Sequence, residues 1–199
     1  MNIKKKLNLF ISTPLKKIMQ NNVNIYNLTA DGHSLFLKFK YIEAEKCFEE
    51  AINLGLNDNE VYYIMGQISR INGKVYNIQK YYDLAVKYGN INALVDLGII
   101  EFYKQNFTKA TQYWKYVIDS NNITAIKRIY KFHYSINNIT VALEYRKIMA
   151  EKGDIPSIKD IINFYKTAND ITNLHKYYIM GIEKKIPEIM WYSLILLNK

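Results

Sequence analysis

Small residues recur at fixed places among large apolar residues, and this repeat constrains the fold more than any other feature of the sequence. In the stretch YIEAEKCFEEAINLG, residues 41–55, Ala44, Phe48 and Ala51 share one face of a helix because they are four and three residues apart. Equivalent sets return at intervals of roughly 32 to 34 residues. These sets are Ile78, Tyr82 and Ala85; Ala110, Trp114 and Val117; Ala142, Arg146 and Met149; and Leu174, Tyr178 and Gly181.

A second repeat alternates with the first. Gly32, Gly66 and Gly98 lie in one register that Tyr130 and Ile162 continue, and an apolar residue stands four positions before each of them. Turn-forming pairs separate the two repeats, and each pair suits the left-handed backbone that ends a helix. The pairs are Asn72-Gly73, Gly89-Asn90, Asn121-Asn122, Asn137-Asn138, Gly153-Asp154 and Asn169-Asp170. The sequence therefore predicts two helices per repeat, each of roughly 12 to 15 residues.

Close packing of helices explains why the small residues are placed so regularly. Where two antiparallel helices cross closely, a larger side chain would push their axes apart, so Ala or Gly is needed at the crossing. Neighbouring large side chains fill the remaining space. Neither helix of a pair can bury its apolar face alone, so each pair must pack on the next. We therefore predict an all-α fold, an α-solenoid of about five antiparallel helix pairs plus a terminal helix.

These residues resemble a known family. Ala44, Phe48 and Ala51, with Gly32 and Gly66, match the tetratricopeptide repeat (TPR) pattern. The stretch KYYDLAVKYGNINALVDLG, residues 80–98, is similar to the related Sel1-like repeat, as is KYYIMGIEKKIPEIMWYSLILL, residues 176–197. The resemblance covers residues 25–199, which we predict to be the repeat domain. It implies a protein-protein interaction scaffold that binds a partner along the inner wall formed by the first helix of each pair.

The first 24 residues differ from the rest in charge. They contain five lysines, Lys4, Lys5, Lys6, Lys16 and Lys17, and no acid, so five of the nine formal positive charges lie there and four remain for the body. We predict a basic leader at residues 1–24, partly disordered or an accessory helix. Contact of residues 1–20 with a membrane surface is the alternative. The apolar runs are too short to span a bilayer.

Motifs that carry chemistry are absent from the sequence. Cys47 is the only cysteine, so an intramolecular disulfide and a cysteine-built zinc site are excluded, and a reducing, intracellular compartment is expected, which we predict to be the cytoplasm. His33, His133 and His175 lack metal-ligand spacing and are expected on the surface or in the groove. The four glutamates of residues 43–50 are expected on the solvated face of a helix. We predict no catalytic residue, no metal, no cofactor and no enzymatic activity.

The resemblance implies that the second, fifth, ninth and twelfth residues of each first helix face the inner wall, and we apply this rule to the first helices of the five pairs. Lys127 and Lys131, one turn apart on one helix, repel each other unless an acidic group offsets them. We therefore predict a protein or peptide partner with an acidic segment, and a solvated basic face is the alternative. Lys159 and Asn163 also resemble a carboxylate-binding pair of the family, although Tyr192 stands where its next member is expected. The candidate peptide-binding residues are Tyr63, Arg70, Ile99, Phe102, Lys127, Lys131, Tyr134, Lys159, Asn163 and Lys166.

A second function is compatible with helical repeats. The stretch ALEYRKIMAEKGDIP, residues 142–156, resembles the pentatricopeptide pattern, so the alternative is a helical-repeat protein that binds single-stranded RNA. The repeat here is shorter than the roughly 35 residues of those RNA readers. The mild charge of the body also gives little affinity for phosphate, which argues against nucleic acid as the partner.

Overall fold

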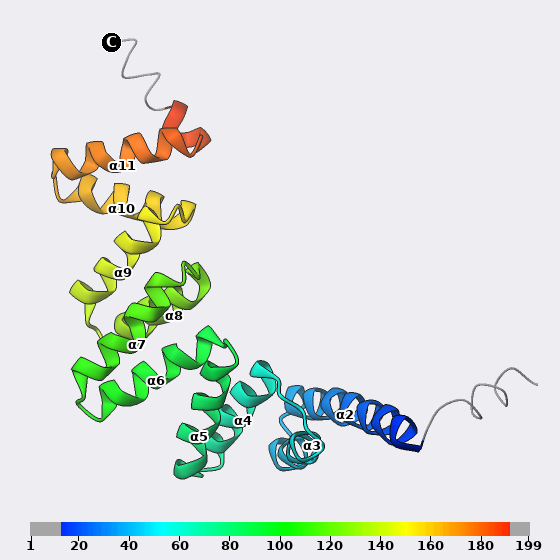
Figure 1. Ribbon diagram of the computed structural model, residues 1–199. Coiled ribbons are helices and arrows are strands. Elements are labelled where there is room, and N and C mark those ends of the chain that lie inside the picture. Colours follow the sequence, from blue (N-terminus) through cyan, green and yellow to red (C-terminus); the bar gives the residue numbers. More distant parts are fainter. Residues whose placement is uncertain (1–12, 192–199) are drawn as a thin grey trace, which may run out of the picture. The chain divides into compact units, whose positions relative to one another are not determined.

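Every regular element of residues 13–191, the part of the chain that the computed structural model describes, is a helix (Figure 1). This confirms the all-α prediction. Residues 187–191 are helical too, and the rest of the predicted terminal helix lies outside the described residues, as do residues 1–12 of the predicted leader. The helices are α2 (Thr13–Leu37), α3 (Tyr41–Asn53), α4 (Asn59–Ile71), α5 (Val75–Lys87), α6 (Ile91–Tyr103), α7 (Phe107–Asp119), α8 (Ile123–Ser135), α9 (Ile139–Glu151), α10 (Ile155–Thr167) and α11 (Ile171–Glu183).

The helices form five consecutive pairs, as the repeat predicts: α2 with α3, α4 with α5, α6 with α7, α8 with α9, and α10 with α11. Each helix from α3 to α11 has 13 residues. The connections between successive helices are equally short, except that residues 54–58 form a longer one between α3 and α4. This longer turn explains why the first spacing of the glycine register exceeds the later ones. Helix α2 passes through position 24, and the division into leader and repeat domain stays a prediction.

Each turn contains one residue with left-handed backbone. At the turn after α9, the N–H of Gly153 donates to the carbonyl of Ala150 at 2.8 Å and that of Asp154 to the carbonyl of Met149 at 3.0 Å, which closes the helix. The carboxylate of Asp154 then accepts the N–H of Ser157 at 3.0 Å, so one residue ends α9 and caps α10. The predicted turn residues Gly73, Gly89, Asn121, Asn137, Gly153 and Asn169 all have φ between 53° and 95°.

Four turns carry left-handed residues that the sequence does not single out: Phe39, Gly55, Gln105 and Lys185, with φ of 60°, 106°, 62° and 54°. Three of them have side chains that rarely adopt this backbone. Their positions nevertheless follow a rule, because left-handed residues recur at a constant interval along the chain from Gly89 to Lys185. The repeat length thus fixes these turns even where the residue type does not favour them.

The described chain divides into two compact units, one ending at Ala93 and the other beginning at Leu94, within α6. Each unit has its own core, built from the apolar faces of its helix pairs. Fully buried side chains of the first unit include Phe48, Met65, Ile68 and Tyr82. Those of the second include Leu97, Ile126, Ile129, Met149, Ile158 and Ile161.

The two repeated sets of residues found in the sequence, the glycines and the large aromatic residues, contact each other inside the helix pairs. In the first three pairs, a glycine on the first helix contacts an aromatic ring on the second so closely that a Cβ atom would overlap the ring. The distances from the built Cβ position are 2.7 Å for Gly32 and Phe48, 2.5 Å for Gly66 and Tyr82, and 2.1 Å for Gly98 and Trp114. The small residues are therefore notches that receive the large ones.

The fourth pair has different residues at both positions of this contact. Tyr130 takes the glycine position and Arg146 takes the aromatic position. The guanidinium of Arg146 lies 4.3 Å from the centre of the Tyr130 ring, contacts its hydroxyl group and pairs with Asp160. A cation over a ring replaces the ring over a glycine, and the crossing of α8 and α9 is retained.

Candidate functional site

Six of the ten predicted site residues lie on α8 and α10 of the second unit. These helices are the first members of successive pairs and occupy equivalent places in the repeat. Their residues therefore form equivalent couples on one side of the repeat. The couples are Lys127 with Lys159, Lys131 with Asn163, and Tyr134 with Lys166.

The lysines of α8 carry uncompensated charge. Lys127 and Lys131 are both exposed, and neither has an ion pair with the acids of residues 13–191. The remaining cation of this helix, Arg128, binds Asp96 at 2.7 Å on the side facing α6. Because the sequence of α8 contains no acid, the exposed turn between Lys127 and Lys131 is purely basic. Tyr134 extends this surface and is 59% exposed, with its ring packed at 5.9 Å on that of Tyr130.

The three predicted residues of α10 line one cavity. Lys159, Asn163 and Lys166 surround about 300 Å³ of open space, whose apolar wall is formed by Ile162, Tyr178 and Ile189. Glu188 lines the same cavity, and its carboxylate accepts a hydrogen bond from Lys159 Nζ at 2.8 Å. This bond lowers the pKa of Glu188 below its ordinary value. The cavity therefore binds one carboxylate already, through a lysine.

Glu188 is a residue of this site that the sequence reasoning missed. It stands one repeat after Pro156, at the second position of the next first helix. The projection of wall positions stopped at the fifth pair and so did not reach it. Extending the same projection by one more repeat would have placed an acid beside Lys159.

Of the other four predicted residues, one is buried, two are half-buried and one is exposed. Tyr63 on α4 is only 7% exposed because its ring packs against that of Tyr82, with centroids 5.8 Å apart. Arg70, in the last turn of α4, is exposed. Both belong to the first unit, whereas Ile99 and Phe102 belong to the second and are half-buried on α6. The structure thus brings Lys159, Asn163 and Lys166 together in one cavity, and it does not add Tyr63 to an open surface.

Phe102 belongs to an aromatic cluster inside the second unit. Its ring centroid lies 5.1 Å from that of Phe107, 5.2 Å from that of Phe132 and 6.0 Å from that of Trp114. These edge-on and tilted contacts stabilise the α6–α7 pair against α8. Most of the Phe102 ring is therefore used for packing rather than for recognition.

His133 is buried in the same cluster, which corrects the expectation of a surface or groove histidine. It is 2% exposed, stacks on Tyr145 at 5.5 Å and meets the edge of Trp114 at 5.0 Å. Neither ring nitrogen has a hydrogen-bond partner among the described residues, and burial lowers the pKa of the imidazole. The burial of His133 could have been predicted from its position in the repeat, because the equivalent residues Ser69, Glu101 and Tyr165 are buried too.

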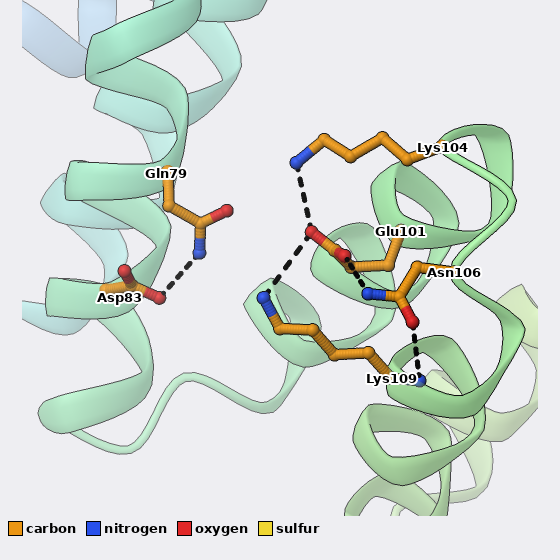
Figure 2. A network of polar contacts seen from close by, with 6 residues as sticks. All are labelled: Gln79, Asp83, Glu101, Lys104, Asn106 and Lys109. Carbon is orange, nitrogen blue, oxygen red and sulfur yellow. Dashed lines mark hydrogen bonds and ion pairs between the residues drawn. The ribbon is translucent and has the colours of Figure 1, made fainter.

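Buried acids in the described helices are compensated within the fold. Figure 2 shows Glu101 at the α6–α7 turn, where Lys104 Nζ binds its carboxylate at 3.0 Å, Asn106 at 3.1 Å and Lys109 at 3.6 Å. These contacts lower the pKa of Glu101. The same figure shows an exposed bond between Gln79 and Asp83 on α5. The Glu101 network holds the turn together and has the character of a structural site.

Three of the four glutamates of residues 43–50 are exposed, as expected, and Glu45 is the exception. It is 4% exposed, and both of its carboxylate oxygens lie 2.8 Å from Lys74 Nζ. Asn72 adds a hydrogen bond at 3.3 Å. This acid therefore links α3 to the turn before α5, and a helical-face pattern does not reveal a partner in the next helix pair.

Metal binding and membrane crossing each require a recognisable arrangement of side chains. Within residues 13–191, no group of three or more His, Cys, Asp or Glu side chains is arranged to hold a metal ion. Over the same part of the chain, no helix combines the length and the apolar character needed to cross a membrane.

Neither a protein-family model nor the sequence of a curated protein matches this chain. Several solved structures resemble it. MamA is 19% identical, with a TM-score of 0.51 over 69% of this chain and 83% of its own. YrrB, described as a TPR protein with an unusual peptide-binding site, is 13% identical, with a TM-score of 0.49 over 92% and 97%. The C-terminal part of a TPR repeat-containing protein from Cytophaga hutchinsonii is 16% identical, with a TM-score of 0.47 over 79% and 65%. The MamA match shows a shared fold.

Proposed function

Because this chain has the tetratricopeptide-type helical-repeat fold, we propose that it is a non-enzymatic scaffold that binds a protein or peptide along the first helices of its second unit. The partner segment is acidic. The observation that carries the proposal is the pair of exposed lysines on α8, Lys127 and Lys131, in register with a cavity on α10 that already binds a carboxylate. Complementary charge of this kind sets orientation and partner choice.

The charge on α8 favours an anionic ligand for a simple reason. Two unpaired lysines one turn apart destabilise their own helix by about 0.2 to 0.5 kcal/mol. An acidic side chain between Lys127 and Lys131 would remove this repulsion and gain hydrogen bonds to charged donors. The exposed ring of Tyr134, in the next turn, offers apolar surface to a neighbouring side chain of the same peptide.

The cavity on α10 provides a second contact. A peptide carboxylate that replaces Glu188 would accept the same hydrogen bond from Lys159, while Asn163 and Lys166 line the remaining space. Glu188 therefore competes with the ligand. Its own pair with Lys159 is weak because both side chains are largely in contact with solvent, so exchange costs little.

Charge reversal tests the proposal. The probe is a fluorescein-labelled glutamate-rich peptide with a free carboxyl terminus, and its glutamine counterpart serves as the neutral probe. In fluorescence anisotropy, we expect the acidic peptide to bind and the double variant Lys127→Glu, Lys131→Glu to lose at least about tenfold in affinity. Helical circular dichroism should not change, because both side chains are exposed.

A matched control separates local from global charge. Lys87→Glu with Lys115→Glu makes the same change in net charge on α5 and α7, which do not belong to the proposed face. This variant should bind as the unmodified protein does, whereas Glu188→Gln should bind more tightly. Equal loss in the control and the α8 variant would show that only net charge matters, and the proposal would then fail.

The single-stranded RNA alternative has no comparable support. Arg128 and Arg146, the two arginines of the second unit, are each bound to an acid. Engaged cations contribute little to phosphate binding, so the salt dependence expected of an RNA-binding protein should be small. Retention of a labelled single strand on a filter, measured against salt, distinguishes the two functions.

A further inference from the structure

The first helix of the structure is much longer than the partner that it packs on. Helix α2 has 25 residues and α3 has 13. The end of α3 fixes where the paired part begins, because Asn53 and Leu54 share a cavity with Asn24 and Asn27 of α2. Residues 13–23, here called the α2 extension, therefore continue past the end of α3 by about 16 Å at 1.5 Å per residue.

One side of this helix is mostly apolar and exposed. Its apolar side chains lie three or four residues apart and occupy about 140° of the helix circumference at 3.6 residues per turn, an arc that also contains the exposed polar side chain of Asn22. They are Leu15, Ile18, Met19, Val23 and, at the start of the paired part, Tyr26, with exposed fractions of 52%, 55%, 55%, 53% and 74%. The opposite side is polar and includes Gln20 and Asn24, which are hydrogen bonded to each other at 3.0 Å. The helix is thus amphipathic in the direction away from its own core.

The charge of this region has a single sign. Residues 1–30 contain five lysines, and the first acid of the chain is Asp31. Lys16 and Lys17 belong to the α2 extension, and Lys16 borders the apolar side. A second copy of this surface would bring lysines against lysines, which is unfavourable. A surface that accepts apolar side chains and carries negative charge complements both features.

We propose that the α2 extension binds the surface of an anionic phospholipid membrane, lying in its plane with the apolar side inserted between headgroups. Leu15, Ile18, Met19 and Val23 enter the acyl boundary, as in amphipathic helices that bind at the bilayer interface. Lys16 and Lys17 extend their ammonium groups to anionic headgroups, with their aliphatic stems over the apolar layer. The site lies in the first unit and is independent of the peptide-binding face proposed for α8 and α10.

Vesicle co-sedimentation of the full chain tests this proposal. We expect the protein to sediment with vesicles of phosphatidylcholine and phosphatidylserine at low salt, and not with phosphatidylcholine alone. The variant Ile18→Gln, Met19→Gln, Val23→Gln should lower the partition coefficient at least about tenfold, since three half-exposed apolar groups no longer leave water. Lys16→Glu with Lys17→Glu should abolish the preference for phosphatidylserine.

A control of the same chemistry is available on α5. Val75→Gln with Tyr76→Gln changes side chains that are 77% and 85% exposed, outside the α2 extension, and should leave vesicle binding unchanged. Circular dichroism verifies that all variants remain folded. Absence of binding by the unmodified protein, or undiminished binding by the triple variant, overturns the proposal. So does a lipid-free dimer, seen by analytical ultracentrifugation, that the triple variant converts to a monomer, because the surface would then join two copies of the chain.

Discussion

Adding one methyl group at Gly98 should destabilise the second unit. The Cβ atom of Gly98→Ala would lie 2.1 Å from Trp114 Nε1 and 2.6 Å from Cδ1, far inside van der Waals contact. The indole is 2% exposed and is surrounded by other rings, including those of Phe102 and His133, so it has no free space to enter. The helix and the ring must therefore separate, which also breaks the 3.3 Å bond from Nε1 to the carbonyl of Val95.

The expected loss follows from three contributions. Alanine is favoured over glycine within a helix by about 1 kcal/mol, which opposes the effect. Overpacking of a filled core costs about 1 to 3 kcal/mol. Leaving a buried N–H without its acceptor costs about 1 to 3 kcal/mol. The free energy of unfolding should therefore fall by about 1 to 5 kcal/mol in Gly98→Ala.

Urea denaturation followed by circular dichroism measures this loss, and a double variant tests its cause. Trp114→Leu removes the ring that the new methyl group meets, at its own cost of about 3 kcal/mol or more. In that background, Gly98→Ala should be neutral or stabilising, so the two changes couple. The reasoning is refuted if Gly98→Ala is as stable as the unmodified protein, or if it costs the same with and without Trp114.

Two further predictions concern the buried histidine and the turns. Burial lowers the pKa of His133 below 6.5, so the unfolded chain binds a proton at this residue at a higher pH than the folded protein does. The free energy of unfolding should therefore decrease as the pH falls through 6.5 toward the lower pKa of the folded state. The urea midpoint measured against pH should change less in His133→Phe over this range, and an unchanged slope would contradict the assignment. Gln105, with φ of 62°, should become more favourable as glycine by about 1 kcal/mol, and Gly89→Gln, at φ of 95°, should lose a similar amount; thermal unfolding of both variants checks this, and equal melting temperatures would refute it.

Much of the fold could be predicted from the sequence because its physical cause is local. The regular placement of glycines among large apolar residues predicts that small residues lie where two helices cross closely, and the structure confirms this for Gly32, Gly66 and Gly98. Turn residues such as Gly153 and Asn169 were predictable from their preference for left-handed backbone. Phe39 and Lys185 were not, because their side chains carry no such preference, and only the length of the repeat places them.

Burial of polar groups was harder to predict. Glu45 was expected in solvent and is paired with Lys74, because the identity of a partner in another helix is not encoded in the pattern of one helix. His133 was expected at the surface and is enclosed by rings from neighbouring helices. The pattern of apolar and polar residues along one helix predicts only the average tendency of a glutamate or histidine to be exposed. Whether a particular one is buried depends on its contacts with neighbouring helix pairs.

In the candidate site, too, features that depend on one helix were predictable and features that depend on contacts between repeats were not. The exposure of Lys127 and Lys131 follows from their place on the polar, solvent-exposed side of α8, a property of one helix. The pairing of Lys159 with Glu188 depends on the next repeat and was not foreseen. Tyr63 illustrates the limit of projecting family positions, since its ring is covered by Tyr82 of the following helix. The binding role of these residues stays a prediction.

The constant spacing of the left-handed turns has a consequence for how such a chain can change in length. From α6 to α11, all helices share one length and all connections share another, so a duplicated or deleted segment of two helices and two connections leaves all later notches facing their rings. An insertion of any other size within a helix would rotate the residues that follow it away from their partners, whereas the longer turn at residues 54–58 shows that a connection can lengthen without this effect. Growth and loss by whole pairs is thus the change that this architecture tolerates most readily, and a gene encoding it can gain or shed binding surface without rebuilding a core.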